Sequence, residues 1–214
     1  MKIFRAALAL CLIGSYARAA DKLIAELLVA AEAGENGRVE TLLAAGAKVN
    51  GRGKSGLTPL LAATTGNHPE TVKLLLDLGA QVDARGDRKS TALFFAAREG
   101  YDSVVLALLA GGADPNATDI DGWTPLLRAA RGNHASTAQL LLDNRANVNH
   151  KTASNYTALM SAARWGCADV VPVLLNAGAD FTIKGKDGRT ALTWAKEANA
   201  KTIADALINS GAKH

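Results

Sequence analysis

One short segment recurs five times in this chain at a fixed spacing of 33 residues. Each copy begins with threonine, continues with proline or alanine and then leucine, and has an alanine three residues after that leucine. The five threonines are Thr58, Thr91, Thr124, Thr157 and Thr190. A fixed period of this length is typical of a solenoid, in which similar units stack in one direction. We therefore expect stacked repeats, an architecture that usually presents a surface for binding.

Each unit is predicted to contain two short helices. In the second unit the first helix is expected over residues 58–65, with Thr58 as its N-cap and a proline at the first helical position. The second helix is expected from about residue 69 to 78, and Gly79 suits the left-handed conformation that follows a helix. Arg145 replaces this glycine in another copy, so we expect the helix end there to be strained or rearranged.

The units are expected to depend on one another for stability. Leucine runs in the second helices and alanine pairs in the first allow close packing, but one helix pair cannot bury its apolar face alone. Between units runs a polar stretch, clearest around Asp121 and Gly122, which predicts a tight turn projecting from the stack. We call each such projection a finger. Lys89 stands at the glycine position of one finger and does not favour this turn.

These motifs resemble those of ankyrin repeats. The resemblance rests on the period, the Thr-Pro-Leu-x-x-Ala segment, the leucine runs and the Gly-Ala-Asp-x-Asn join at residues 112–116. It implies an all-α solenoid of about six helix-turn-helix units with β-hairpin-like fingers, whose first and last units act as caps. The chain departs from the family at the histidine after Thr-Pro-Leu, which puts the hydrogen bonds of that histidine in doubt. The expected repeats span residues 20–50, 51–83, 84–116, 117–149, 150–182 and 183–214.

Residues 1–19 have the layout of a secretory signal peptide. Lys2 and Arg5 form a basic start, residues 6–14 form an apolar run, and Ala17 and Ala19 supply small residues at the −3 and −1 positions of the cleavage site. The apolar run is too short to span a bilayer. We therefore expect cleavage after Ala19, a periplasmic or secreted mature chain, and no membrane anchor.

Two asparagines bear on the compartment. Asn116 and Asn155 both match the N-glycosylation pattern, and both fall at finger positions where a glycan would crowd the expected binding face. Most bacteria lack this modification, so we expect a bacterial periplasm rather than a eukaryotic secretory route.

The charge of the chain argues against a nucleic-acid partner. The 24 basic and 20 acidic residues give a formal net charge of +4. Three basic residues and no acid lie in the signal segment, so 21 basic and 20 acidic residues remain after cleavage. A charge of +1 lacks the strong basic footprint of a nucleic-acid-binding protein.

No catalytic, cofactor or metal site is expected. His68 and His134 occupy the same position in their repeats and are interpreted as structural, and no histidine pair has metal-ligand spacing. Residues 51–56 superficially resemble a phosphate loop but lack its spacing. Cys167 is the only cysteine beyond the signal segment and has no obvious base beside it. We interpret it as a half-buried thiol at a repeat junction, against the alternative of a reactive or intermolecular thiol.

The candidate partner-binding residues are those that differ between copies on the first helices and fingers, the concave side in ankyrin proteins. They are Phe95, Arg98, Trp123, Arg128, Arg131, Tyr156, Arg164 and Trp165. Aromatic and arginine side chains are common binding anchors. The alternative for Trp123 and Tyr156 is packing between fingers. Arg98, Arg131 and Arg164 hold one position in three consecutive repeats, so they either face an acidic partner or only complement the helix dipole.

The sequence thus predicts a non-catalytic, monomeric module that binds a protein partner of unknown identity. By analogy with small exported ankyrin proteins, we expect it to protect, regulate, inhibit or assemble a periplasmic enzyme. Three alternatives stay open: an immunity-type inhibitor of a toxin, a scaffold with several weak partners, and an enzyme with a site on the concave face.

Overall fold

The computed structural model describes residues 20–53 and 56–212, so the expected signal segment lies outside the described residues. A helix over residues 20–32 opens this part of the chain. The elements that follow are α2 (Asn36–Ala44), α3 (Pro59–Thr65), α4 (Pro69–Asp77), η1 (Asp87–Lys89), α5 (Ala92–Glu99), α6 (Asp102–Ala110), α7 (Pro125–Arg131), α8 (Ala135–Asp143), α9 (Ala158–Trp165), α10 (Val170–Asn176), α11 (Ala191–Glu197) and α12 (Lys201–Asn209).

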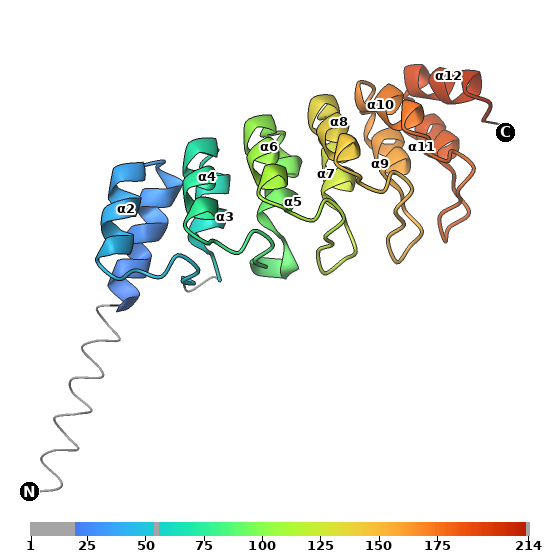
Figure 1. Cartoon of the computed structure of the whole chain (residues 1–214). Helices are drawn as coiled ribbons and strands as arrows, with labels where there is room; N and C mark the ends of the chain where they lie inside the picture. The colour runs from blue at the N-terminus through green and yellow to red at the C-terminus, as the bar shows by residue number, and fades with distance from the viewer. Residues whose placement is uncertain (1–19, 54–55, 213–214) are drawn as a thin grey trace, which may run out of the picture.

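The helices form two rows, and the fingers project to one side of them (Figure 1). Helices α3, α5, α7, α9 and α11 follow one another in the first row, and each packs on the next as well as on the second helix of its own pair. One continuous apolar core runs between the rows and along the stack. The chain is therefore an all-α solenoid, as the period predicts. We call the side formed by the first helices and the fingers the finger face.

The fingers are turns rather than paired strands. Each is closed by one backbone hydrogen bond across its base, as between the Asp119 amide and the Trp123 carbonyl at 3.0 Å. No strand is assigned in residues 20–53 or 56–212. The finger with Lys89 is the irregular one, because Arg88 and Lys89 both have positive φ, 51° and 59°, within the short helix η1.

The repeated threonines cap the first helices, which confirms the role predicted for them. In each of the five copies the threonine Oγ1 accepts a hydrogen bond from the amide three residues later, as from Leu127 to Thr124 at 3.4 Å. Such a bond satisfies one of the amides that a helix start leaves without a partner. Thr124 is 1 % exposed, so no water replaces this partner.

Arg145 stands at a helix end where the other repeats have glycine. Gly79 has φ of 87°, the left-handed conformation expected after a helix. Arg145 keeps the same conformation, with φ of 68°, instead of rearranging. This region is unfavourable for residues with a Cβ, so the predicted strain is present. The Arg145 carbonyl accepts a hydrogen bond from the Asn116 side chain at 3.1 Å, which ties the strained segment to the preceding repeat.

A ladder of side-chain amides connects successive repeats. Asn50, Asn116 and Asn149 each donate to a carbonyl in the next repeat, at 3.0, 3.1 and 3.1 Å, and each accepts from an amide there at 2.8 Å. Asp83 holds the same position and accepts from the Asp114 amide at 3.2 Å. These bonds fix the register of the stack, which places side chains of the same slot in line.

Candidate functional site

Arginine and aromatic side chains alternate across four repeats of the finger face. The contacts run from the Arg98 guanidinium over Phe95 (5.1 Å to the ring centre) to the Arg189 guanidinium over Trp194 (4.6 Å). We call the whole set the arginine–aromatic stripe. Its members are Phe94, Phe95, Arg98, Trp123, Arg128, Arg131, Tyr156, Arg164, Trp165, Arg189 and Trp194. All eight candidate partner-binding residues belong to it, so the fold links them in one unbroken series of side-chain contacts.

Arg128 differs from the exposed anchor that the sequence suggests. Its guanidinium lies between Phe94 and Trp123, 4.7 and 4.5 Å from the ring centres, and its side chain is 19 % exposed. It donates to Asp119 Oδ2 at 3.1 Å, and the Asp119 side chain is 1 % exposed. Burial lowers the pKa of Arg128, while the hydrogen bond and charge of Asp119 oppose that shift. Arg128 is therefore a neutralised, largely internal part of the stripe.

Asp119 also shapes the finger that carries Trp123. Its Oδ1 atom accepts from the backbone amides of Asp121 and Trp123, both at 2.9 Å. One buried carboxylate thus fixes a turn, orients Trp123 and neutralises Arg128. Buried charges are tolerated when they are paired and hydrogen-bonded in this way.

Trp123 and Tyr156 pack against neighbouring fingers, as the alternative interpretation of these two residues predicts. Their ring centres are 5.8 Å apart, and Tyr156 meets Trp194 edge-on at 6.3 Å. Burial raises the pKa of Tyr156, and the positive charges of Arg164 and Arg131 oppose this rise. The packing leaves both Trp123 and Tyr156 partly exposed. Trp165 is 53 % exposed and is the only aromatic side chain of the described residues in the exposed class.

The arginine row lies at the ends of the first helices. Arg98, Arg131 and Arg164 each occupy the last turn of α5, α7 or α9, where a cation complements the helix dipole. Their side chains also contact aromatic rings, which adds about 0.5–1 kcal/mol at exposed positions. Complementing the helix dipole and facing an acidic partner are therefore compatible roles for the arginine row.

His134 and Cys167 occupy the same position in successive repeats, and each contacts a backbone carbonyl of the arginine row in the preceding repeat. His134 Nε2 lies 3.0 Å from the Arg98 carbonyl, and the Cys167 thiol donates to the Arg131 carbonyl at 3.2 Å. Cys167 is 6 % exposed, and burial raises the pKa of its thiol. A protonated, buried thiol is a poor nucleophile, which supports the structural interpretation of Cys167 over the reactive one.

Two buried polar atoms of the stripe have no hydrogen-bond partner among the described residues. They are Arg128 Nε and Trp194 Nε1, and both residues hold the position four residues after the repeated threonine. Unsatisfied buried groups are uncommon and destabilising in folded proteins.

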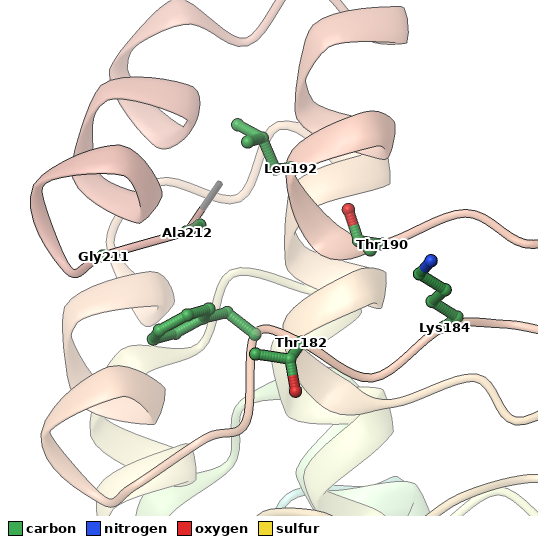
Figure 2. Close-up of a pocket in the computed structure, with 7 residues that line it drawn as sticks. Thr182, Lys184, Thr190, Leu192, Gly211 and Ala212 are labelled. Atoms are coloured by element: carbon green, nitrogen blue, oxygen red, sulfur yellow. The ribbon is translucent and has the colours of Figure 1, made fainter. Parts of the chain in front are cut away.

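Two hollows differ in position, one lying within the stripe and one at the end of the stack. One of about 200 Å³ lies within the stripe and is lined by Trp123, Arg131, Thr152, Ser154, Tyr156, Arg164 and Trp165. The other, of about 320 Å³, lies at the α11–α12 end of the described stack (Figure 2). Phe181, Leu192 and Ala212 give it an apolar wall, and Lys184 is the one charged residue that lines it. The smaller hollow is lined by Arg131 and Arg164, which hold one repeat position, and by residues that vary between repeats.

The described part of the chain contains no group of three or more histidine, cysteine, aspartate or glutamate side chains that could hold a metal ion. Within the same residues, none of the helices has the length and apolar character needed to cross a membrane.

Sequence reasoning did not select Asp119, Phe94, Arg189 or Trp194 as partner-binding residues. A signal for the first was present: Asp119 stands where other copies have glycine or threonine, and Arg128 departs from the pattern in the same repeat. Two departures of opposite charge in one unit indicate a compensating pair. Arg189 is held by Asp187 and Glu197, both at 3.0 Å, contacts that no spacing in the sequence reveals.

The fold defines a helical repeat protein whose finger face differs from repeat to repeat. A family model described as ankyrin repeats (3 copies) matches residues 27–119 and 111–185, well over half of the chain. The chain belongs to the ankyrin-repeat family, whose members generally act as non-catalytic protein–protein interaction modules. A search of curated proteins finds no match to the chain.

Proposed function

We propose that this protein is an exported interaction module that binds a partner protein through the arginine–aromatic stripe and protects, regulates or assembles that partner. The observation that carries the proposal is the continuity of the stripe over four repeats. Tryptophan, tyrosine and arginine are enriched among residues that dominate binding energy. An exposed Trp165 beside two arginines offers apolar area and charge at the same place.

Export to a bacterial periplasm is the second part of the proposal. The layout of residues 1–19 supports it, with cleavage after Ala19. The structure of the amide ladder is consistent with a compartment without N-glycosylation. The Asn116 side chain bridges the Arg145 carbonyl and the Asn147 amide, and a glycan on its nitrogen would disrupt that bridge.

A variant that removes the arginine row tests the proposal. The purified protein and Arg98→Ala/Arg131→Ala/Arg164→Ala are immobilised and exposed to periplasmic extract of the source organism at low and moderate salt. We expect the original protein to retain a stable partner and the variant to lose most of it. The salt dependence of binding should fall at the same time, because exposed charges are screened by salt.

The matched control removes three positive charges away from the finger face. Arg38, Lys73 and Lys201 are exposed on α2, α4 and α12, so their replacement by alanine should leave binding unchanged. Equal affinity and salt dependence of the arginine-row variant would rule out the stripe as the binding surface.

The mass of the protein isolated from its cells is expected to correspond to a chain that begins at Ala20, and an intact N-terminus would contradict export.

A further inference from the structure

The arginines of the stripe are not equivalent in charge pairing. Arg98 pairs with Glu99 at 2.6 Å, Arg128 with Asp119 at 3.1 Å, and Arg189 with Asp187 and Glu197. Arg131 and Arg164, in contrast, form no ion pair with any residue in the ranges 20–53 and 56–212. Two adjacent repeats therefore present positive charge that this part of the chain does not neutralise.

These two arginines line the same hollow. The Arg131 guanidinium lies 4.5 Å from the ring centre of Trp165, and that of Arg164 lies 5.8 Å from it. Arg131 also contacts Trp123 at 5.9 Å, and Arg164 contacts Trp194 at 4.5 Å. Ring contacts thus hold both cations beside a space of about 200 Å³, although their like charges repel each other.

The rest of the wall provides apolar area and hydroxyl groups. Trp123, Tyr156 and Trp165 form the aromatic part, and Thr152 and Ser154 contribute hydroxyls that lie 3.1 Å from each other. Ligand pockets for small molecules usually enclose about 300–1,000 Å³, so this volume suits a single side chain better. Guanidinium groups bind planar carboxylates through paired, charge-assisted hydrogen bonds.

We propose that this hollow binds the carboxylate of one aspartate or glutamate side chain of the partner protein, held between Arg131 and Arg164 with its methylene stem against Trp165. The inference rests on the proposed function. A carboxylate is favoured because it is the group that Arg98, Arg128 and Arg189 already bind within this chain. The partner supplies the acid that the stripe lacks at its centre.

Peptide binding to the ¹⁵N-labelled protein tests this inference by NMR. The probes are three blocked peptides of alanine and leucine that carry one central glutamate, glutamine or phosphoserine. The glutamate peptide is expected to shift the indole signals of Trp123 and Trp165 and the side-chain signals of both arginines, and the glutamine peptide is not. In Arg131→Gln/Arg164→Gln, affinity should fall by about tenfold or more, as for the loss of a charge-assisted hydrogen bond.

The control variant Arg38→Gln/Lys73→Gln loses the same charge elsewhere and should bind the glutamate peptide as the original protein does. Equal binding of the glutamate and glutamine peptides, binding of the phosphoserine peptide alone, or no shift with any peptide would overturn the inference. Partner capture separates this failure from that of the proposed function. If Arg131→Gln/Arg164→Gln retains the partner while the three-alanine variant loses it, the carboxylate site is wrong and the stripe stands. If both variants retain the partner, the proposed binding face is wrong.

Discussion

Replacement of Leu108 by alanine is expected to lower the free energy of unfolding by about 2–5 kcal/mol. Leu108 lies on α6 in the middle of the stack and is fully buried in the continuous core. Its removal leaves a cavity that both neighbouring repeats line, and because a repeat contacts only its neighbours, no distant contact compensates. Urea denaturation followed by circular dichroism measures the loss.

Leu106 provides the matched control on the same helix. It is 49 % exposed, so Leu106→Ala removes the same atoms without opening a cavity. We expect a change within about 0.5 kcal/mol, the usual range for surface substitutions. Equal effects of the two substitutions would show that the two-row core is wrong at this repeat.

Replacement of Gly66 by alanine is also expected to lower the free energy of unfolding substantially. Gly66 has φ of −75°, which any residue adopts, so space rather than backbone conformation requires the glycine. An added Cβ would lie 2.1 Å from the Glu32 carbonyl oxygen of the preceding repeat. Backbone cannot yield as a flexible side chain can, so the first repeat must move away. We expect a loss of about 1–3 kcal/mol, with hydrogen exchange rising first in residues 20–45.

Gly37 gives the opposite expectation for the same substitution. It lies within α2, and an added Cβ there meets no atom within 4 Å. Alanine is a better helix former than glycine, so Gly37→Ala should stabilise by up to about 1 kcal/mol. A neutral Gly66→Ala variant with unchanged exchange in the first repeat would contradict the close contact between the first two units.

The repeat period was sufficient to predict most of the fold. Thr58 with its following proline predicted a helix start, and Gly79 predicted a helix end, because capping depends on local chemistry that residue type reveals. The strain at Arg145 was also predictable, since its neighbours in register all have glycine. The same register predicts that the arginine row lies in line along the stack.

Which arginines of the stripe form ion pairs could not be predicted in the same way. The sequence ranks Arg98, Arg128, Arg131 and Arg164 alike, yet only Arg131 and Arg164 form no ion pair with a described residue. Pairing depends on side-chain reach across a finger or around a helix end, which the repeat period does not encode. The hydrogen bonds of Cys167 and His134 to the preceding repeat were likewise invisible, although their common slot was present in the sequence.

The stripe carries features that stability alone does not explain. Arg128 Nε and Trp194 Nε1 are buried without a hydrogen-bond partner among the described residues, which is unfavourable, and the ring of Trp165 is exposed. Local departures from good packing are common at functional sites. These features support the proposal that the stripe binds a partner.

The most direct test of this account is site-specific photo-crosslinking in the cells that make the protein. A photoreactive benzoyl-phenylalanine is placed at Ser154, beside the hollow of the stripe, or at Leu106, which is exposed on the second-helix row. We predict that the Ser154 position crosslinks to one defined partner protein and that the Leu106 position does not. Crosslinks from Leu106 to the same partner, or none from Ser154, would contradict a partner bound on the arginine–aromatic stripe.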